Sequence, residues 1–156
     1  MEPDPERQKI EALLREKART ATGQTRALGF EFVSAHPRGA VIRLPWREDL
    51  VGNPETRVLH GGVITTLVDS VCGWSLFSAL GGEADIATLD LRIDYLHPAE
   101  PDRDVFARGE VYKMTRSIAF LRAVAYQDED EPIANCVATF MVGANTPKLQ
   151  ARGAAQ

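Results

Sequence analysis

Hydrophobic residues recur with a helical period near the start of the chain and with the two-residue period of strands over much of the remainder. Between residues 5 and 21 apolar side chains return at intervals of three and four, with Glu and Arg on the other side, which predicts an amphipathic surface helix that Gly23 interrupts. Residues 29–46 hold two strand-like runs separated by His-Pro-Arg-Gly, which predicts a hairpin. Residues 47–60 show neither period and predict a loop.

The most apolar stretch of the chain is residues 61–80, GGVITTLVDSVCGWSLFSAL. It is too long for a typical strand and apolar on nearly every side, which predicts a helix buried all round that ends at Gly81 and Gly82. Four strand-like segments follow, at residues 86–96, 104–114, 117–127 and 132–142. The breaks between them are too short for crossover helices, so neighbouring strands are expected to pair antiparallel.

These elements predict one α+β domain, because 156 residues lie near the usual size of a single domain. An antiparallel sheet must curl around the buried helix to cover it, and about six strands leave that cover incomplete. We therefore expect a second copy of the chain to close the opening. The last dozen residues are expected to form a frayed tail.

Charge and composition argue against several classes of function. Lys and Arg number 18 against 22 Asp and Glu, and the net charge of −4 provides no positive field for nucleic acid. The charged first residues and the lack of an apolar run near 18 residues argue against secretion and a membrane span. Cys72 and Cys136 lie among apolar neighbours without paired spacing, which predicts buried thiols and a cytoplasmic location.

Asp69 stands in the middle of the apolar helix, where burying a carboxylate costs several kcal/mol unless it is paired or neutral. No cationic residue lies within one turn. At 100° per residue its face is shared by small residues: Gly62, Thr65, Thr66, Cys72 and Gly73. One interpretation is a structural carboxylate bonded to a threonine or to the backbone. The small neighbours favour the other, a functional carboxylate with space above it.

His60, Gly61 and Gly62 stand at the start of the same helix, where backbone N–H groups lack intrahelical partners and the dipole is positive. Two glycines allow a ligand to approach these amides, which is the geometry of an oxyanion hole. The alternative is a tight corner with His60 as a cap. His36, His60 and His97 lie in separate segments, so we expect no metal site and no Ser-His-Asp triad.

Asn53, the H-G-G at His60, and the run V-I-T-T-L-V-D ending at Asp69, followed by four strands, resemble one family. It is the hotdog-fold acyl-CoA thioesterases of the phenylacetate-degradation (PaaI-like) type, and the match spans Phe30 to Val142. The resemblance implies a hotdog domain over residues 25–143, with a separate amphipathic helix in residues 1–24 and a flexible tail in residues 144–156.

The resemblance also implies a reaction and roles for the motif residues. The reaction is hydrolysis of an acyl thioester in a cleft at a dimer interface, without a cofactor, since coenzyme A is part of the substrate. Asp69 would act as nucleophile or as general base, and the Gly61 amide would form the oxyanion hole. His60 and Asn53 of the partner subunit would polarise the carbonyl or position the nucleophile.

Thr88 falls where similar enzymes carry a serine or threonine near the aspartate. The strand periodicity opposes this assignment, because Thr88 has the same parity as Asp90 and Arg92 and would then face water.

Binding of coenzyme A by an acidic chain requires local cations, since the carrier brings several phosphate charges. The turn at residues 113–117, which contains Lys113, Arg116 and Ser117, supplies two cations and two hydroxyls without an adjacent acid. By resemblance Arg116 lies near the nucleotide end of coenzyme A. The alternative is an ordinary solvated turn.

The sequence thus predicts an acyl-CoA thioesterase that releases a small to medium acyl or aryl-acyl group as free acid, assembled as a dimer or a dimer of dimers (a homotetramer). Trp74, Phe77 and Leu80 would line the acyl pocket if they face the cleft. The alternative is a non-catalytic protein that binds acyl-CoA or an acyl carrier, which Asp69 disfavours because a binding module has no need for a buried carboxylate. A hotdog dehydratase ranks third.

Overall fold

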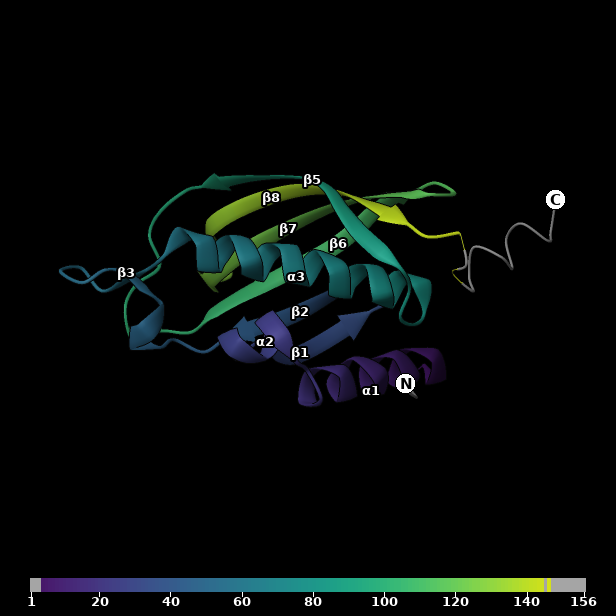
Figure 1. The fold of residues 1–156 in the computed structure, drawn as a ribbon, viewed down its shortest axis with the longest axis horizontal. Coiled ribbons are helices and arrows are strands. Elements are labelled where there is room, and N and C mark those ends of the chain that lie inside the picture. Colours follow the sequence, from purple (N-terminus) through teal and green to yellow (C-terminus); the bar gives the residue numbers. More distant parts are fainter. Residues whose placement is uncertain (1–3, 145, 147–156) are drawn as a thin grey trace.

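Six strands form one antiparallel sheet that curves around helix α3 (Figure 1). The computed structural model describes residues 4–144 and residue 146. In spatial order the strands are β1 (Glu31–His36), β2 (Gly39–Leu44), β6 (Val105–Met114), β7 (Ile118–Asp128), β8 (Glu131–Val142) and β5 (Ile86–Tyr95). The predicted α+β architecture, the hairpin and the four later strands are confirmed. Most of the expected tail, residues 144–156, lies outside the described residues.

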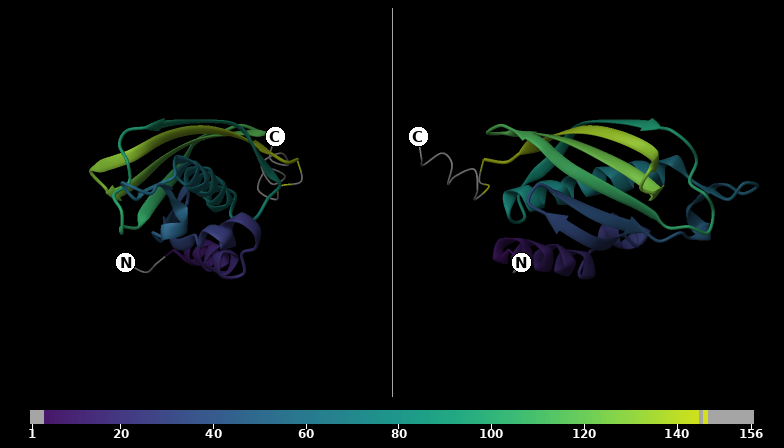
Figure 2. Two further views of the ribbon diagram at one scale, coloured as in Figure 1. Left: turned by 60° about the vertical axis from the view of Figure 1, so that its left-hand side comes forward. Right: turned by 180° about the vertical axis from the view of Figure 1, so that it is seen from behind.

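Helix α3 (Gly61–Leu80) has the predicted bounds and lies in the trough of the sheet (Figure 2). Gly81 ends it in the left-handed conformation, with φ of 74°, which favours glycine. Of the described helices, only α3 is long and apolar enough to cross a membrane, and 67% of that stretch is buried inside the fold as a core helix. The prediction that α3 is buried all round is wrong, because Gly62 is exposed and Thr66, Asp69 and Ser70 are half-buried.

The N-terminal region forms two helices where one was predicted. Helix α1 (Pro5–Arg19) begins at Asp4, whose side chain accepts a hydrogen bond from the Glu6 amide at 3.0 Å, and it buries Ile10 and Leu14. Helix α2 (Gly23–Leu28) follows, so Gly23 begins a helix as well as interrupting the first. A six-residue helix is too short to show a hydrophobic period.

Residues 47–60 contain more structure than the predicted loop. A 3₁₀ turn, η1 (Glu48–Leu50), leads into a small hairpin of β3 (Val51–Asn53) and β4 (Val58–Leu59), which projects at one end of the molecule beside the start of α3. Strands of three and two residues cannot display a period of two, which explains why the sequence pattern gave no signal.

Strand β5 contains a bulge that changes which side chains face the helix. Thr88 pairs with Phe140 and Asp90 pairs with Thr139, so Leu89 has no partner. The extra residue reverses the alternation, and Thr88 and Tyr95 both point toward α3. The prediction that Thr88 shares a face with Asp90 is therefore wrong, because a strict two-residue period does not survive a bulge.

Candidate active site

Asp69 is half-buried on the side of α3 that faces β5. Its Oδ1 accepts a hydrogen bond of 2.9 Å from the exposed hydroxyl of Thr88. Among the described residues, Oδ2 has no hydrogen-bond partner and Asp69 has no ion pair. A carboxylate with a purely structural role is normally satisfied inside the fold. Asp69 instead keeps one oxygen free at an accessible surface, which is what a base or a nucleophile requires.

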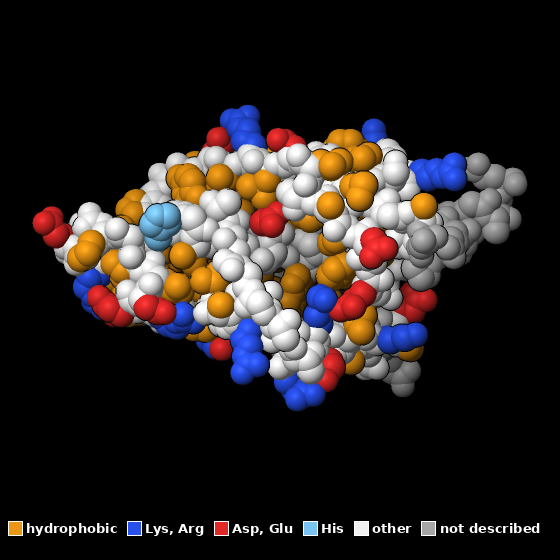
Figure 3. All heavy atoms as spheres, in the orientation of Figure 1, with side chains coloured by type: hydrophobic (Ala, Val, Ile, Leu, Met, Phe, Trp, Pro, Cys, Tyr) orange, Lys and Arg blue, Asp and Glu red, His pale blue; other side chains and the backbone are white. Residues whose placement is uncertain are grey.

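The residues of α3 that face β5 are small and spaced by four: Gly61, Thr65, Asp69 and Gly73. The lack of bulk lets β5 approach closely, and a methyl group added at Gly73 would lie 3.5 Å from Ile86. Figure 3, in the orientation of Figure 1, shows hydrophobic side chains toward the middle of this face and many of the charged ones at its rim. Within a single chain, Gly61, Thr65 and Asp69 remain partly accessible to solvent.

The first turn of α3 holds His60 in one orientation. The Gly62 amide donates to His60 Nδ1 at 2.9 Å, and the Val63 amide donates to the His60 carbonyl. A backbone amide can only donate, so Nδ1 is the acceptor, and Nε2 of a neutral ring carries the proton. His60 is exposed and therefore presents a hydrogen-bond donor.

The Gly61 amide is the first of α3, and no acceptor for it lies within the described part of the chain. This free N–H at the positive end of the helix dipole can bind an anion, as the sequence suggested. Asp69 lies eight positions after Gly61, a rise of about 12 Å along a helix. One thioester carbonyl cannot reach both groups within a single chain.

Asn53 lies at the end of β3, and its Oδ1 accepts a hydrogen bond from the Glu55 amide at 3.0 Å. Its carbonyl accepts from the Arg57 amide at 2.7 Å. Asn53 therefore closes the turn of the hairpin and is not brought to Asp69 of its own chain. Within one chain, Asp69 is hydrogen-bonded to Thr88, and His60 and Gly61 lie together at the start of α3. Asn53 lies apart from both pairs.

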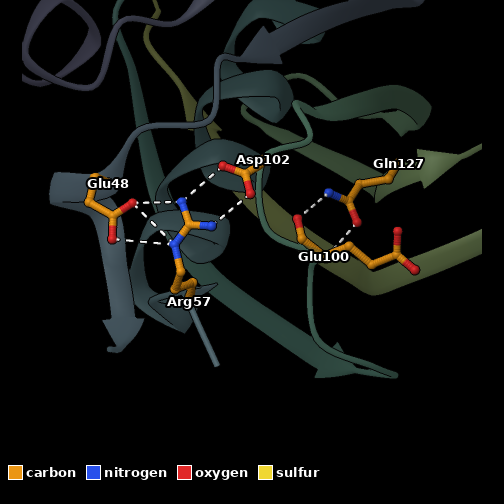
Figure 4. Close-up of polar contacts among 5 residues, drawn as sticks. All are labelled: Glu48, Arg57, Glu100, Asp102 and Gln127. Atoms are coloured by element: carbon orange, nitrogen blue, oxygen red, sulfur yellow. Dashed lines mark hydrogen bonds and ion pairs between the residues drawn. The ribbon is translucent and has the colours of Figure 1, made fainter. Parts of the chain in front are cut away.

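Arg57 clamps this hairpin to the loop between β5 and β6, a feature that the sequence pattern did not reveal (Figure 4). Its guanidinium bonds Glu48 at 2.8 Å and Asp102 at 2.7 Å, and it lies 4.7 Å from the centre of the Trp46 ring. The hydrogen bond from Arg57 lowers the pKa of Asp102. Arg57 and Asp102 both adopt positive φ, 57° and 60°, which is uncommon outside glycine.

Glu100 and Gln127 tie the same loop to β7 (Figure 4). The Gln127 side chain accepts from the Glu100 amide at 2.8 Å and donates to the Glu100 carbonyl at 2.9 Å. The loop on which the Arg57 clamp rests is thus itself held to the sheet.

Cys72 and Cys136 are buried and free, as the sequence predicted. The hydrogen bond with Cys136, burial and the nearby charge of Asp69 raise the pKa of Cys72 well above its ordinary value. A buried thiol with a raised pKa is a poor nucleophile, which disfavours a catalytic role for Cys72.

The aromatic residues proposed for the acyl pocket lie on the other side of α3. Trp74 is buried and stacks on Phe32 with ring centres 6.2 Å apart, and Lys17 Nζ lies 5.0 Å from the centre of the Phe77 ring. Leu80 is buried in the core. Trp74 and Phe77 thus pack against residues of the N-terminal half, and the condition under which they would line an acyl pocket beside Asp69 is not met within one chain.

Of the two predicted cations, Arg116 lies in the turn between β6 and β7, whereas Lys113 lies within the end of β6 and pairs with Phe120. Lys113 and Arg116 are exposed, and neither has an ion pair with any residue that the structure describes. The Thr115 hydroxyl accepts from the Ile118 amide at 3.1 Å, and the Ser117 carbonyl accepts from the Val142 amide at 2.8 Å. The backbone of the turn is therefore fixed, and the two cations are available to an anion.

The described residues form no metal centre at Asp69. Within residues 4–144 and 146, no three His, Cys, Asp or Glu side chains are placed to hold a metal ion. A shallow cavity of about 580 Å³ is lined by Arg108, Glu110 and Arg122, among others. It lies on the outer face of the sheet, away from α3, because the intervening Gly109 points toward the helix.

The chain is similar in sequence to known thioesterases. A family model described as the thioesterase superfamily matches residues 57–134. The medium/long-chain acyl-CoA thioesterase YigI of Escherichia coli K12 is 30% identical over 131 residues, which cover 76% of this chain and 84% of that protein. Human acyl-coenzyme A thioesterase 13 is 32% identical over 103 residues, 62% of this chain and 71% of that protein.

Solved structures resemble the fold over most of its length. A Pseudomonas aeruginosa protein is 40% identical with a TM-score of 0.71, covering 88% of this chain and 98% of that one. The Escherichia coli PaaI protein of the phenylacetic acid degradation operon has a TM-score of 0.77, with 90% and 97% of the two chains covered. At 16% identity the PaaI likeness concerns the fold alone.

Proposed function

We propose, from the premise that this chain belongs to the thioesterase superfamily and is a thioester hydrolase, that it hydrolyses acyl-CoA with a small to medium acyl group. The observation that carries the proposal is Asp69, a half-buried carboxylate with one free oxygen in an otherwise apolar helix. The aryl-acyl option has less support, because Trp74 and Phe77 pack away from Asp69. Because the YigI relative is named a medium/long-chain acyl-CoA thioesterase, longer acyl chains belong in the test as well.

Asp69 supports two routes to the products. As a general base, its free oxygen takes a proton from water while the water oxygen bonds to the thioester carbonyl carbon. The tetrahedral intermediate then collapses, the C–S bond breaks, and the CoA thiolate leaves and takes up the proton held by Asp69. As a nucleophile, it bonds that carbon itself and expels the CoA thiolate, and water then hydrolyses the acyl-aspartate anhydride. In both routes the carbonyl oxygen becomes an oxyanion that the Gly61 amide can bind, and one such donor typically lowers the barrier by about 2.7–4 kcal/mol.

A site shared by two chains follows from the separation of these groups. The rise of about 12 Å between Gly61 and Asp69 keeps them from acting on one carbonyl unless a second copy supplies one of them. The outer edge of β5 has no partner strand in the described chain, and Leu89, Tyr95 and Leu96 are exposed on or beside it. We propose a dimer through this edge, or a dimer of dimers. Light scattering measures the mass in solution, and a stable folded species near 17.1 kDa, the mass of one chain, would contradict the proposed dimer.

The remaining assignments complete the proposal. His60 presents its Nε2 proton to the substrate carbonyl, and Asn53 assists in polarising that carbonyl or in positioning the nucleophile. Both residues come from the subunit opposite the one that supplies Asp69. Lys113, Arg116 and Ser117 hold the phosphates of coenzyme A, and no further cofactor is required. Two free buried thiols support a cytoplasmic location.

The test is thiol release from a panel of acyl-CoA thioesters of increasing chain length, with aryl-acyl-CoA included. Asp69→Asn keeps the shape of the side chain but removes its charge, and kcat should fall by at least about 100-fold. Asp130→Asn, at an exposed carboxylate in the turn between β7 and β8, is the control and should retain full activity. Calorimetric binding of acyl-CoA by the wild-type protein without thiol release would instead identify a binding protein.

A further inference from the structure

Tyr95, the last residue of β5, contacts the first turn of α3 through its hydroxyl. The hydroxyl donates to the Gly61 carbonyl at 2.7 Å. The Thr65 hydroxyl lies 3.2 Å from the same carbonyl oxygen and is also hydrogen-bonded to the Tyr95 hydroxyl. Because Tyr95 uses its one proton on the carbonyl, the single Thr65 proton is shared between that carbonyl and the Tyr95 oxygen. Two hydroxyl groups from separate elements thus converge on one backbone oxygen, beside the amide proposed to bind the oxyanion.

This contact continues through the backbone to His60. The carbonyl that accepts from Tyr95 belongs to the Gly61–Gly62 peptide group, whose N–H donates to His60 Nδ1 at 2.9 Å. A hydrogen bond to a peptide oxygen polarises the group and strengthens the bond that its N–H makes. Tyr95 is therefore linked through one peptide to the ring that presents the Nε2 proton.

The two glycines make such support necessary. Glycine lets a thioester approach the backbone, but it also leaves the chain more conformational freedom than any other residue. The Tyr95 ring limits that freedom on one side, since a methyl group added at Gly61 would lie 3.4 Å from the Tyr95 hydroxyl.

Core packing does not account for Tyr95. The residue remains 52% exposed, and its described polar contacts are the bonds to Gly61 and Thr65. An exposed side chain of this size contributes little through burial alone. Any contribution of the ring at the proposed dimer edge is retained in Tyr95→Phe, so the hydroxyl can be tested by itself.

We propose that Tyr95 is a positioning residue that fixes the Gly61 amide and the His60 ring for the reaction, an inference that rests on the proposed thioesterase function. Tyr95 acts through the Gly61–Gly62 peptide and does not itself exchange a proton. Loss of its hydroxyl lowers turnover with little effect on the binding of coenzyme A, whose proposed cation site is at Lys113 and Arg116.

The experiment compares Tyr95→Phe with wild type and with Tyr112→Phe. The control removes the hydroxyl of another exposed tyrosine, on β6, for which the described chain offers no hydrogen-bond partner. For Tyr95→Phe we expect kcat to fall about fivefold, the kinetic equivalent of one neutral hydrogen bond, with KM within about twofold and the melting temperature unchanged. Tyr112→Phe should match wild type.

A second readout does not depend on activity. In protein carrying ¹⁵N-glycine, the Gly62 amide should exchange its proton several-fold faster in Tyr95→Phe, while core amides remain as in wild type. Thr65→Val, which removes the other hydroxyl, should accelerate the same amide and provides the test if Tyr95→Phe does not fold.

The outcomes separate the two proposals. A wild-type protein without thioesterase activity refutes the proposed function, and the exchange of Gly62 still tests the contact. Unchanged kcat and unchanged Gly62 exchange in Tyr95→Phe overturn the inference. It is also overturned by a rise in KM at constant kcat, or by an equal loss in Tyr112→Phe.

Discussion

Replacing Thr88 with valine keeps the branched shape of the side chain and removes the hydroxyl that donates to Asp69 at 2.9 Å. The free Oδ2 of Asp69 remains available, so the chemistry of the carboxylate is intact. What the variant loses is the bond that holds the carboxylate plane against β5. Thr88→Val therefore measures how much of the activity depends on the orientation of Asp69.

The magnitude follows from the exposure of the pair. A hydrogen bond to a charged group contributes about 1.5–3 kcal/mol when solvent is excluded. Thr88 is exposed and Asp69 half-buried, so water replaces part of the lost bond, and about 1 kcal/mol is a reasonable value. At about 1.36 kcal/mol per tenfold change, kcat should fall about fivefold.

Steady-state thiol release provides the assay, with Thr88→Ser as the matched variant that retains the hydroxyl. Thr88→Val should lower kcat about fivefold with little change in KM, and Thr88→Ser should stay near wild type. In Asp69→Asn the same Thr88→Val change should have almost no further effect, since the bond serves Asp69. Full activity in Thr88→Val, or an equal loss in Thr88→Ser, would refute the reasoning.

Three further predictions concern other parts of the molecule. Arg116→Ala should raise KM for acyl-CoA at nearly constant kcat, and a short thioester without the nucleotide should not respond; equal losses for both substrates would indicate a structural role. Gly109→Ala should lower the free energy of unfolding in urea by about 1–3 kcal/mol, because the added methyl would lie 2.5 Å from the buried Ser75 hydroxyl. The hydrogen bond from Arg122 lowers the pKa of Glu110 below its ordinary 4.5, so Glu110→Gln should be less stable than wild type at neutral pH by under about 1 kcal/mol. That difference should vanish as the pH falls through the lowered pKa, and its persistence in acid would exclude this cause.

The helix at residues 61–80 was predicted with its true bounds because it combines the strongest signals that a sequence can carry. It is long, apolar and closed by two glycines, one of which adopts φ of 74°. The later strands were predicted because they are ten to twelve residues long with short connections. Length was decisive, since α2 and the hairpin of β3 and β4, each at most six residues long, gave no signal.

Thr88 shows a different limit of sequence patterns. Its neighbours alternate as a regular strand would, and only the pairing of β5 with β8 reveals that Leu89 has no partner. A bulge depends on the register with the neighbouring strand, which a single sequence does not contain. Tyr95 lies beyond the bulge and keeps the parity of Leu91 and Ile93, so of the two contacts of β5 with the site only that of Thr88 was beyond the reach of periodicity.

The site itself shows why the functional prediction required more than the pattern of one chain. The motif lists Asn53, His60, Gly61 and Asp69 within seventeen consecutive residues, as though they were neighbours. In the fold a rise of about 12 Å of helix separates Gly61 from Asp69, and Asn53 closes the turn of a hairpin. Gly61 and Asp69 are therefore close in the sequence but are held apart in space by the rigid helix between them. A second copy of the same helix can bring the Gly61 amide of one chain to the Asp69 of the other, so one short motif can supply both halves of a shared site.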